Sequence, residues 1–568
     1  MPRLPFKTAF TVLLIALHCF ADLSTSAQAT YNWAVRQKSG GTMHESPDAM
    51  CVGTDGNVYV ALNFNSSDIE FKTGLSVYNT GTGYYDVVIV KYDAADGAVL
   101  WIKPLRGIYH EQARSMACGS NGNIYIGGTF RSPYMTVGID TIWNREYGNI
   151  YPQEDMFMIA LSEDSGNVQW TKGFGGTGSD YLTSLASDHW GNIIAGGYYY
   201  SDSLTLGTTQ MPADPYGNMF ILKMNGQTGN ILWARTHNSG GQYHETLKAI
   251  SIDNQGNIYT AGEFNSSWLV FDSILLIRQK LIDVYLIRFN PQGIATWGMV
   301  YSSPQNDYVQ SIATYHNKLY LCIDNTIIYE NGIWPDSSKL MKIDIAGKTI
   351  EWNKNFSRIR FKQVVIDTSG YVLTGGYARD TTNMDGVLIK CYKEYWPDLF
   401  VLALDTASGK ALWAKTYTKL IESGFVISRS SLQSMCTNHN GTVFTGFKFN
   451  NIGIQLDNIM LTNAIKETYD YFVSRINYVY IGVGVEETPQ DNGQVWLYPN
   501  PGSNELVIIS TDIIEQCTVR DMSGAVLLHI SGQSLKHTVN TTSMASGIYI
   551  VSMQIQGMPV NRLWVKVE

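Results

Sequence analysis

The sequence is poor in charge and lacks the short motifs that mark common catalytic sites. Charged residues make up 16% of its 568 residues, the net charge is −9, and Lys and Arg form no cluster, which argues against a nucleic-acid partner. It contains no H-E-x-x-H motif, no C-x-x-C pair and no serine nucleophile elbow. Gly347-Lys348-Thr349 resembles the end of a P-loop, but Lys342 stands where that motif requires its first glycine.

Long apolar runs are also missing beyond the N-terminus. Residues 1–29 predict a secretory signal peptide, with an apolar stretch over residues 9–21 and a cleavage site at Ala27-Gln28-Ala29. Cys19 would suit a lipoprotein signal, but His18 precedes it where a small residue is expected. Since no other segment is long enough to cross a bilayer, we expect no transmembrane segment in the mature chain.

What the sequence does contain is a repeat. Tryptophans recur at intervals of roughly 55 to 69 residues, and six of them close a similar short phrase such as Gly229-Asn-Ile-Leu-Trp233. A period of this length, built from strand-like runs, is typical of an array whose units cannot bury both faces alone. The recurring residues are Trp33, Trp101, Trp170, Trp233, Trp297, Trp352 and Trp413.

Each unit predicts four short strands. An apolar run ends at a hairpin turn such as Asp55-Gly56-Asn57, where Gly and Asn supply the positive-φ positions. A second strand follows, then a polar stretch, then a third strand that opens with an acid such as Asp86 or Asp155. A second turn leads into the strand that carries the Trp. Four strands per unit are typical of a propeller blade.

The seventh unit lacks its own Trp, because Val485 stands where one is due. The N-terminal segment 31–36, which contains Trp33, supplies the missing strand. Pairing the first strand with the last unit removes two exposed sheet edges. The sequence therefore predicts an all-β fold, with a seven-bladed β-propeller over residues 30–480 that is closed by the N-terminal strand.

Six cysteines follow the predicted signal peptide. Cys51, Cys118 and Cys436 lie at nearly the same place in their repeats, on the strand before the first turn. An even number in a secreted protein permits disulfides. Because Ala and Ser occupy this position in other units, we expect free buried cysteines in a packed layer.

After a polar linker over residues 481–494, the last segment follows a different strand pattern. Residues 495–568 predict a small C-terminal β-sandwich. The segment also resembles the type A C-terminal sorting domain of the type IX secretion system of certain Gram-negative bacteria. The resemblance rests on Tyr498, Pro499, Asn500, Pro501, Asp521, Gly524, Gly547, Tyr549 and Lys566. It implies export by the type IX secretion machinery, so that the protein is secreted or held on the outer cell surface after periplasmic transit.

The propeller region resembles two families. Its Gly-Asn turns and Gly-Gly strand ends are similar to bacterial seven-bladed propeller repeats, and Leu404-Asp405 to Trp413 is similar to the PQQ-like repeat. The PQQ-like resemblance would imply a quinoprotein dehydrogenase. Those enzymes typically have eight blades, an adjacent cysteine pair and a calcium-binding carboxylate cluster, whereas this chain has seven units and no Cys-Cys pair. We therefore expect no cofactor, and a scaffold by itself does not define a function.

Acids and histidines recur where each Trp strand leads into the next unit. With strands alternating in direction, they fall on the same face as the acids of the third strands and the long variable connections. A repeat-fixed acid most often bonds neighbouring backbone N–H groups, whereas a ring of carboxylates and imidazoles would hold a cation or a polar ligand. Whether a metal binds is left open. The candidate residues are Glu45, Glu111, Asp180, Glu245, Asp307, His44, His110 and His244.

The function predicted from these features is binding. We expect an exported scaffold propeller that recognises a protein or glycan on the cell surface or outside the cell through its loop-rich acidic face. Aromatic residues in the loops, such as Trp143, Tyr198, Tyr200 and Trp268, suit sugar stacking or a protein anchor. The alternative is a polysaccharide-active enzyme that uses the carboxylates of the same face.

Overall fold

The computed structural model describes most of the chain, and every regular element in the described part is a β-strand. The predicted all-β fold is confirmed. The described residues are 28–39, 44–72, 74–81, 83–146, 148, 152–202, 204–212, 217–240, 245–329, 332–367, 370–391, 398–420, 430–438, 441–449, 453–457, 459–462, 470–479, 495–498, 505–521, 525–530, 533–545, 547–555 and 558–566.

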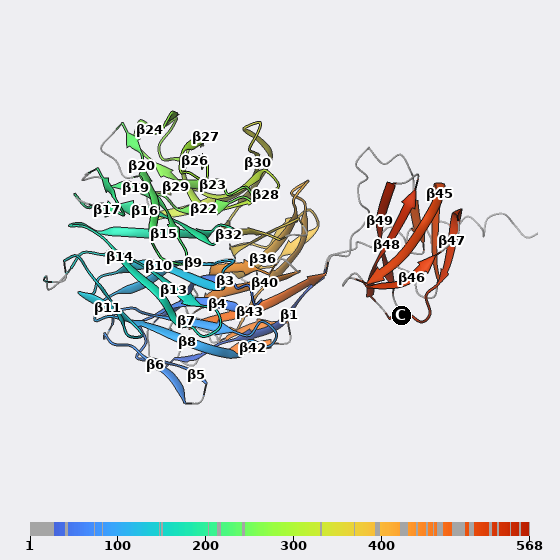
Figure 1. Cartoon of the computed structure of the whole chain (residues 1–568), viewed down its shortest axis with the longest axis horizontal. Coiled ribbons are helices and arrows are strands. Elements are labelled where there is room, and N and C mark those ends of the chain that lie inside the picture. The colour runs from blue at the N-terminus through green and yellow to red at the C-terminus, as the bar shows by residue number, and fades with distance from the viewer. Residues whose placement is uncertain are drawn as a thin grey trace, which may run out of the picture. The chain divides into compact units, whose positions relative to one another are not determined.

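The chain divides into two compact units, residues 1–481 and 482–568. In the first unit, antiparallel sheets built on four main strands follow one another along the chain (Figure 1), and we number them sheets 1 to 7; two further short strands extend sheet 1 to six strands. Sheets 1 to 3 contain β3 (Glu45–Val52), β4 (Val58–Phe64), β7 (Asp86–Tyr92) and β8 (Val99–Arg106); β9 (Glu111–Cys118), β10 (Asn123–Phe130), β13 (Asp155–Ser162) and β14 (Val168–Phe174); and β15 (Asp180–Ser187), β16 (Asn192–Tyr199), β19 (Asn218–Asn225) and β20 (Ile231–Thr236).

The later sheets repeat this order. Sheets 4 to 7 contain β22 (Ala249–Ile252), β23 (Ile258–Phe264), β26 (Asp283–Phe289) and β27 (Ala295–Tyr301); β28 (Asn306–Tyr315), β29 (Lys318–Tyr329), β30 (Gly332–Asp344) and β31 (Thr349–Ser357); β32 (Ile359–Ile366), β33 (Tyr371–Ala378), β36 (Asp398–Asp405) and β37 (Ala411–Thr416); and β39 (Ser431–Thr437), β40 (Thr442–Phe449), β43 (Asp470–Val479) and β1 (Gln28–Val35).

In most sheets, the connection between the second and third strands contains further short strands. They pair into small hairpins, several with one strand from the preceding connection. They are β2 (Lys38–Ser39), β5 (Asp68–Lys72), β6 (Leu75–Tyr78), β11 (Tyr134–Val137), β12 (Asp140–Trp143), β17 (Leu204–Leu206), β18 (Thr209–Met211), β21 (Asn238–Ser239), β24 (Trp268–Phe271), β25 (Ile274–Ile277), β34 (Thr382–Met384), β35 (Val387–Ile389), β38 (Thr418–Leu420), β41 (Gly453–Leu456) and β42 (Ile459–Thr462).

The first strands of neighbouring sheets lie against one another. β3 contacts β9, β9 contacts β15, and the series continues through β22, β28, β32 and β39, which in turn contacts β3. Strand β1 pairs antiparallel with β43, from Gln28 opposite Val479 to Val35 opposite Val473. The N-terminal strand therefore completes a sheet whose other strands come from the end of the unit.

The sheets are apolar on both faces, because each packs between two others. All seven residues of β4 are buried, and so are all seven of β7. Continuous apolar runs of this kind are expected when a strand is covered on both sides. Each interface between sheets is thus a layer of hydrophobic core, and a single sheet would leave two such faces exposed to water.

Five of the recurrent tryptophans join their sheet to the next one through an indole hydrogen bond, whereas the buried indole nitrogen of Trp297 has no hydrogen-bond partner. The indole Nε1 of Trp101 in sheet 1 donates to the carbonyl of Glu163 in sheet 2 at 3.1 Å, and Trp170 of sheet 2 bonds Gly226 of sheet 3 at 2.8 Å. The same bond runs from Trp233 to Pro291, from Trp352 to Thr406 and from Trp33 to Ala94. Trp33 of β1 thus makes to sheet 1 the contact that four other tryptophans make to their neighbours.

A glycine in the accepting turn lies against the indole. A Cβ built on Gly166 would come within 3.0 Å of the Trp101 ring, and one on Gly229 within 2.8 Å of Trp170. Both glycines have φ near +65°, so the backbone and the ring select glycine for separate reasons. The turn facing Trp297 differs, because Lys348 takes the glycine position at φ +53° and places its ammonium 5.8 Å from the ring centroid.

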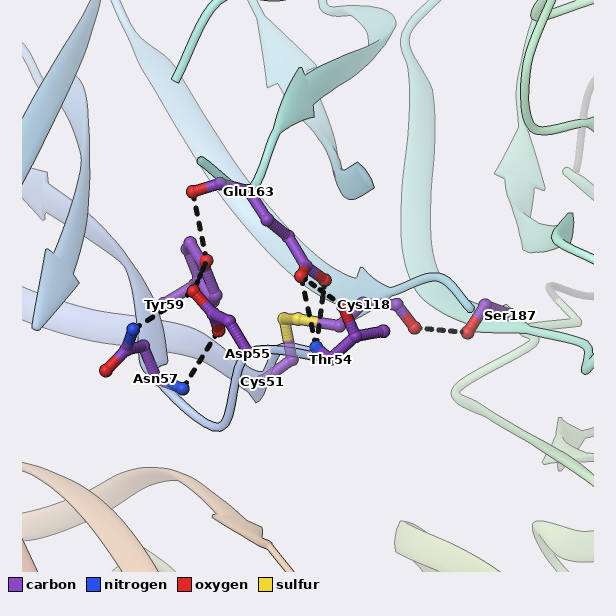
Figure 2. The surroundings of a disulfide bond; sticks show 8 residues. All are labelled: Cys51, Thr54, Asp55, Asn57, Tyr59, Cys118, Glu163 and Ser187. Carbon is purple, nitrogen blue, oxygen red and sulfur yellow. Dashed lines mark hydrogen bonds between the residues drawn. A yellow bond between two sulfur atoms is a disulfide. The ribbon is translucent and has the colours of Figure 1, made fainter. Parts of the chain in front are cut away.

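A disulfide between Cys51 and Cys118 links sheets 1 and 2 (Figure 2), with a Cα–Cα distance of 5.9 Å. The expectation of free cysteines is therefore wrong for this pair. The two residues end equivalent strands that lie side by side, which brings their Cα atoms into the usual disulfide range. Cys436, at the equivalent place in sheet 7, is free.

Hydrogen bonds around the disulfide fix the hairpin turns (Figure 2). Asp55 accepts bonds from the backbone N–H and side-chain amide of Asn57 and from the Tyr59 hydroxyl, and its carboxylate lies 2.7 Å from the Lys91 ammonium. The Glu163 carboxylate accepts bonds from the backbone and hydroxyl of Thr54 in the neighbouring sheet. The Asp-Gly-Asn residues therefore stabilise the hairpin turn, as the sequence pattern predicts.

The second unit, residues 482–568, is also antiparallel throughout. Its long central strand pairs with two strands along its first half and with two others along its second half, around a buried core that includes Trp564. The strands are β44 (Val495–Tyr498), β45 (Glu505–Asp521), β46 (Val526–Ile530), β47 (Ser534–Asn540), β48 (Gly547–Ile555) and β49 (Met558–Lys566). The linker predicted over residues 481–494 lies outside the described residues.

We expect Gly166→Ala to destabilise the propeller unit more than Gly56→Ala does. Both glycines have positive φ, so both substitutions carry the same backbone cost of about 1 kcal/mol. Only Gly166 faces a ring, whereas a Cβ on Gly56 meets nothing within 4 Å. The free energy of unfolding in urea should fall by roughly a further 1–2 kcal/mol for Gly166→Ala. Equal losses would show that the indole contact does not constrain this turn.

Candidate functional site

The five candidate carboxylates lie between sheets rather than at an open mouth. Each stands at the start of a first strand or just before it, where the sequence analysis placed it, but its exposed fraction is 0–1%. Burial of a charged carboxylate is costly unless it is hydrogen-bonded or protonated. The five are Glu45, Glu111, Asp180, Glu245 and Asp307.

A buried serine accompanies each of these acids. The Ser201 hydroxyl donates to Asp180 at 2.7 Å, and the Ser266 hydroxyl donates to Glu245. In these two sheets the serine follows the acid by 21 residues, at the end of the second strand. Asp307 instead receives the backbone N–H and hydroxyl of Ser303, both at 2.7 Å.

Four of these acids, all except Glu245, also face the third-strand acid of the preceding sheet; the third strand before Glu245 opens with Asn218 instead. Burial, together with the charge of Asp180, raises the pKa of Asp155 to about 7, and burial raises that of Asp180 to about 6. Burial and the nearby carboxyl of Asp86 raise the pKa of Glu111 well above its ordinary value. Two carboxyl groups in one dry site favour retention of a proton, because both cannot ionise cheaply.

The joint between sheets 7 and 1 adds a cation to this arrangement. Arg36, just after β1, donates to Asp470 at 2.6 Å. Burial raises the pKa of Glu45 to about 8, with Ser66 and Arg36 opposing the shift and Asp470 adding to it. The acid that opens sheet 1 is thus tied to the strand that completes sheet 7.

Two of the three candidate histidines, His44 and His110, lie within the described residues. The backbone N–H of His44 donates to the side-chain oxygen of Asn65, and burial lowers the pKa of its imidazole. His110 Nδ1 accepts the backbone N–H of Tyr85 at 3.3 Å, and its ring packs against Tyr84. His244 lies outside the described residues.

A further histidine, His237, lies beside one of the acids: its Nε2 is 3.7 Å from the Glu245 carboxylate at a fully buried position. No repeat marks this histidine, since it comes from the connection that follows β20 rather than from a strand. Within the described ranges, no three His, Cys, Asp or Glu side chains are grouped so that they would hold a metal ion. The carboxyl pairs are suited to sharing protons and fixing neighbouring sheets.

Aromatic side chains cluster on the same face as the acids. Tyr181 of β15 stacks on Tyr198 of β16 with ring centroids 4.9 Å apart, and Tyr200 meets both rings edge-on. The three side chains are half-buried. Further out, Trp143 is 59% exposed and Trp268 is 38% exposed. This face therefore offers rings at which a sugar or an apolar side chain can stack.

The sorting-motif residues are divided between strand ends and turns. Tyr498 ends β44, Asp521 ends β45, and Lys566 ends β49. Gly547 opens β48, where the buried Tyr549 donates its hydroxyl to the carbonyl of Ala545 at 2.5 Å. Pro499, Asn500, Pro501 and Gly524 lie outside the described residues.

Residues 496–566 match the family described as the secretion system C-terminal sorting domain. The predicted sorting domain is confirmed. Such a domain implies that the type IX secretion machinery exports the chain to the cell surface or beyond. The part of the chain that the structure describes has no helix with the length and apolar character needed to span a membrane.

Curated relatives match only part of this chain. An uncharacterized WD repeat-containing protein of Acanthamoeba polyphaga mimivirus is 23% identical over 36% of this chain and 16% of its own length. The regulatory protein FlaEY of Caulobacter vibrioides is 28% identical over 31% of this chain and 18% of its own length. The chain thus spans less than a fifth of either relative.

Solved structures with similar folds are distant. Hydrazine synthase of Kuenenia stuttgartiensis has 9% identity and a TM-score of 0.40, over 76% of this chain and 99% of that one. The WD40 propeller domain of Doa1 has 9% identity and a TM-score of 0.36, over 80% of this chain and 97% of that one. Scores this low carry no argument about function, and the propeller architecture rests on the strand pairing described above.

We expect the stability of the propeller unit to fall as the pH rises from 5 to 8.5. The folded-state pKa values of Glu45 (about 8) and Asp155 (about 7) lie above the ordinary values of 4.5 and 3.8. The stabilisation from these protons is complete below about pH 4 and is lost as the pH rises through 7 and 8, because the folded state binds more protons than the unfolded chain. Urea unfolding across this range measures the slope.

Glu45→Gln should flatten that slope, since the amide donates a hydrogen bond without a titratable proton. Asp164→Asn is the matched control, because Asp164 is an exposed carboxylate in a turn of sheet 2. A Glu45→Gln profile that coincides with the wild-type profile would rule out proton retention at this joint.

Proposed function

We propose that residues 30–480 form a seven-bladed β-propeller closed by the N-terminal strand, and that this propeller binds a ligand outside the cell. The seven sheets in succession, the contact from β39 back to β3 and the pairing of β1 with β43 support the closure. The bond from Trp33 to Ala94 supports it independently, because it repeats at the seventh interface the contact seen at others.

The sorting domain is the observation that carries the proposal. Because residues 496–566 match it, the propeller is cargo for the type IX machinery and works beyond the outer membrane. The predicted signal peptide over residues 1–29 would take the chain into the periplasm first. The Cys51–Cys118 disulfide fits this route, since disulfides persist in oxidising compartments.

Binding is favoured over catalysis by the burial of the candidate acids. Glycoside hydrolysis needs two carboxyl groups that flank a bound sugar. Glu45, Glu111, Asp180, Glu245 and Asp307 are almost wholly buried and take part in joints between sheets. The rings of Tyr181, Tyr198 and Tyr200 are half-buried on the same face. A protein or glycan ligand that stacks on these rings is the function we infer.

Ending the chain at Glu487 should leave a folded propeller in the periplasm. The ring is complete without residues 495–568, and the two compact units meet near residue 481. Cell fractionation measures export, and circular dichroism with thermal unfolding measures the fold. Removal of residues 31–36 is the contrasting variant, because it exposes the edge of β43 and should cause aggregation. Secretion of the Glu487 truncation would contradict the sorting role.

Tyr200→Ala should weaken ligand binding by about tenfold, the loss expected for one stacked ring. The purified protein would be screened against glycans and envelope proteins, and the affinity of each hit measured by calorimetry. Trp190→Ala is the control, because Trp190 is 57% exposed in the turn between β15 and β16 on the opposite face. Failure to find any ligand, together with turnover of a polysaccharide, would overturn the binding role.

A further inference from the structure

The first strands place one residue each at a common register position that faces the centre of the propeller. Each position lies three residues after the place in the first strand where the candidate acids stand in sheets 1 to 5. The residues at these positions are half-buried or exposed, whereas the residue before each of them is buried. At six of these positions the strand pairing shifts by one residue, a β-bulge that leaves the residue out of the pairing with the second strand. We call this set the axial ring: Asp48, Arg114, Thr183, Lys248, Gln310, Lys362 and Gln433.

The axial ring is basic in a protein whose net charge is −9. It contains three cations, Arg114, Lys248 and Lys362, against one carboxylate. That carboxylate, Asp48, already accepts bonds from the Ser46 hydroxyl and the Asn63 amide, both at 2.5 Å. The acid is therefore partly satisfied by its own neighbours and leaves positive charge along the axis.

The ring cations act on one another although they come from different sheets. Partial burial lowers the pKa of Lys362; Asp48 and Asp324 oppose the shift, while Arg360 and Lys248 add to it. Within the described residues neither Lys362 nor Lys248 forms an ion pair with a carboxylate. The Lys362 side chain is still open to solvent, and the carboxylates of Asp48 and Asp324 act on its charge only through space.

A pocket of about 160 Å³ opens beside Lys362, between the first strands of sheets 5, 6 and 7. Gln310, Gln433 and the Ser431 hydroxyl line it together with Tyr377 and Arg360. Arg360 is neutralised by Asp324, whose carboxylate lies 2.5 Å from its Nε. The lining thus combines one ammonium that forms no ion pair in the described chain with the polar side chains of Gln310, Gln433 and Ser431, of which the Gln433 amide donates to the Ser431 hydroxyl.

We propose that this axial pocket binds an oxyanion, the phosphate, sulfate or carboxylate group of a ligand. An ammonium with converging neutral donors is the arrangement that stabilises such a group. The pocket is smaller than the roughly 300–1,000 Å³ that drug-sized ligands occupy, so it takes a compact ion or one charged end of a larger molecule. This assignment rests on the proposed binding role and gives its ligand a chemical class.

The test is calorimetric titration of the purified protein with sodium sulfate, sodium phosphate, sodium glucuronate and, as a neutral control, glucose. The wild type should bind at least one oxyanion and not glucose. Lys362→Gln should weaken that binding about tenfold or more, because a charge-assisted hydrogen bond is lost. Gln433→Glu should abolish it, and Lys410→Gln, which neutralises an exposed lysine in a turn of sheet 6, should bind like the wild type.

Thermal unfolding of each variant separates lost binding from lost folding. A preference for sulfate or phosphate indicates a sulfated or phosphorylated ligand, and a preference for glucuronate indicates a carboxylate sugar; both support the site. Absence of binding to all three oxyanions, or wild-type binding by Lys362→Gln, overturns it. A protein that binds a glycan in the wider screen but no oxyanion keeps its proposed function and loses this site, and the reverse result keeps the site and loses the function.

Discussion

The joint between an indole and a glycine turn is the constraint on which the rest of the propeller unit depends. Every sheet is apolar on both faces, so hydrophobic burial draws sheets together without fixing how far one slides along another. The Trp101 nitrogen needs an acceptor, and its ring needs a surface free of side chains. The turn around Glu163 and Gly166 meets both needs at one place. Direction and register between neighbours follow from that coincidence.

Much of this could be predicted from the sequence, because the periodic residues act within or between adjacent strands. The Trp intervals and the Asp-Gly-Asn turns indicate four strands per unit, and four-stranded sheets are observed. The environment of the acids could not be predicted, since the same spacing fits an open ring and a buried joint. A serine 21 residues after Asp180, and likewise after Glu245, was the available signal that these carboxylates have a fixed internal partner.

The disulfide could not be predicted from the repeat alone. Cys51, Cys118 and Cys436 occupy equivalent places in three sheets, and β3 lies between β9 and β39. Cys51 therefore has two candidate partners at similar distances along the array. No residue in the sequence distinguishes Cys118 from Cys436 as the partner of Cys51. The side-chain geometry at the end of β3 selects Cys118. Local differences between nominally equal interfaces decide such pairings.

The pairing of β1 with β43 has a kinetic consequence. Gln28 lies opposite Val479, so the first strand of the unit to be made must wait for almost the whole unit before its partner exists. Closing so long a loop costs little more entropy than closing one of moderate length, but it delays the final contact. Until then β43 presents an open edge. A protein built this way forms its last backbone hydrogen bonds only when synthesis and transport of the unit are complete. Cooperative folding of the unit therefore requires that it arrive as an intact chain.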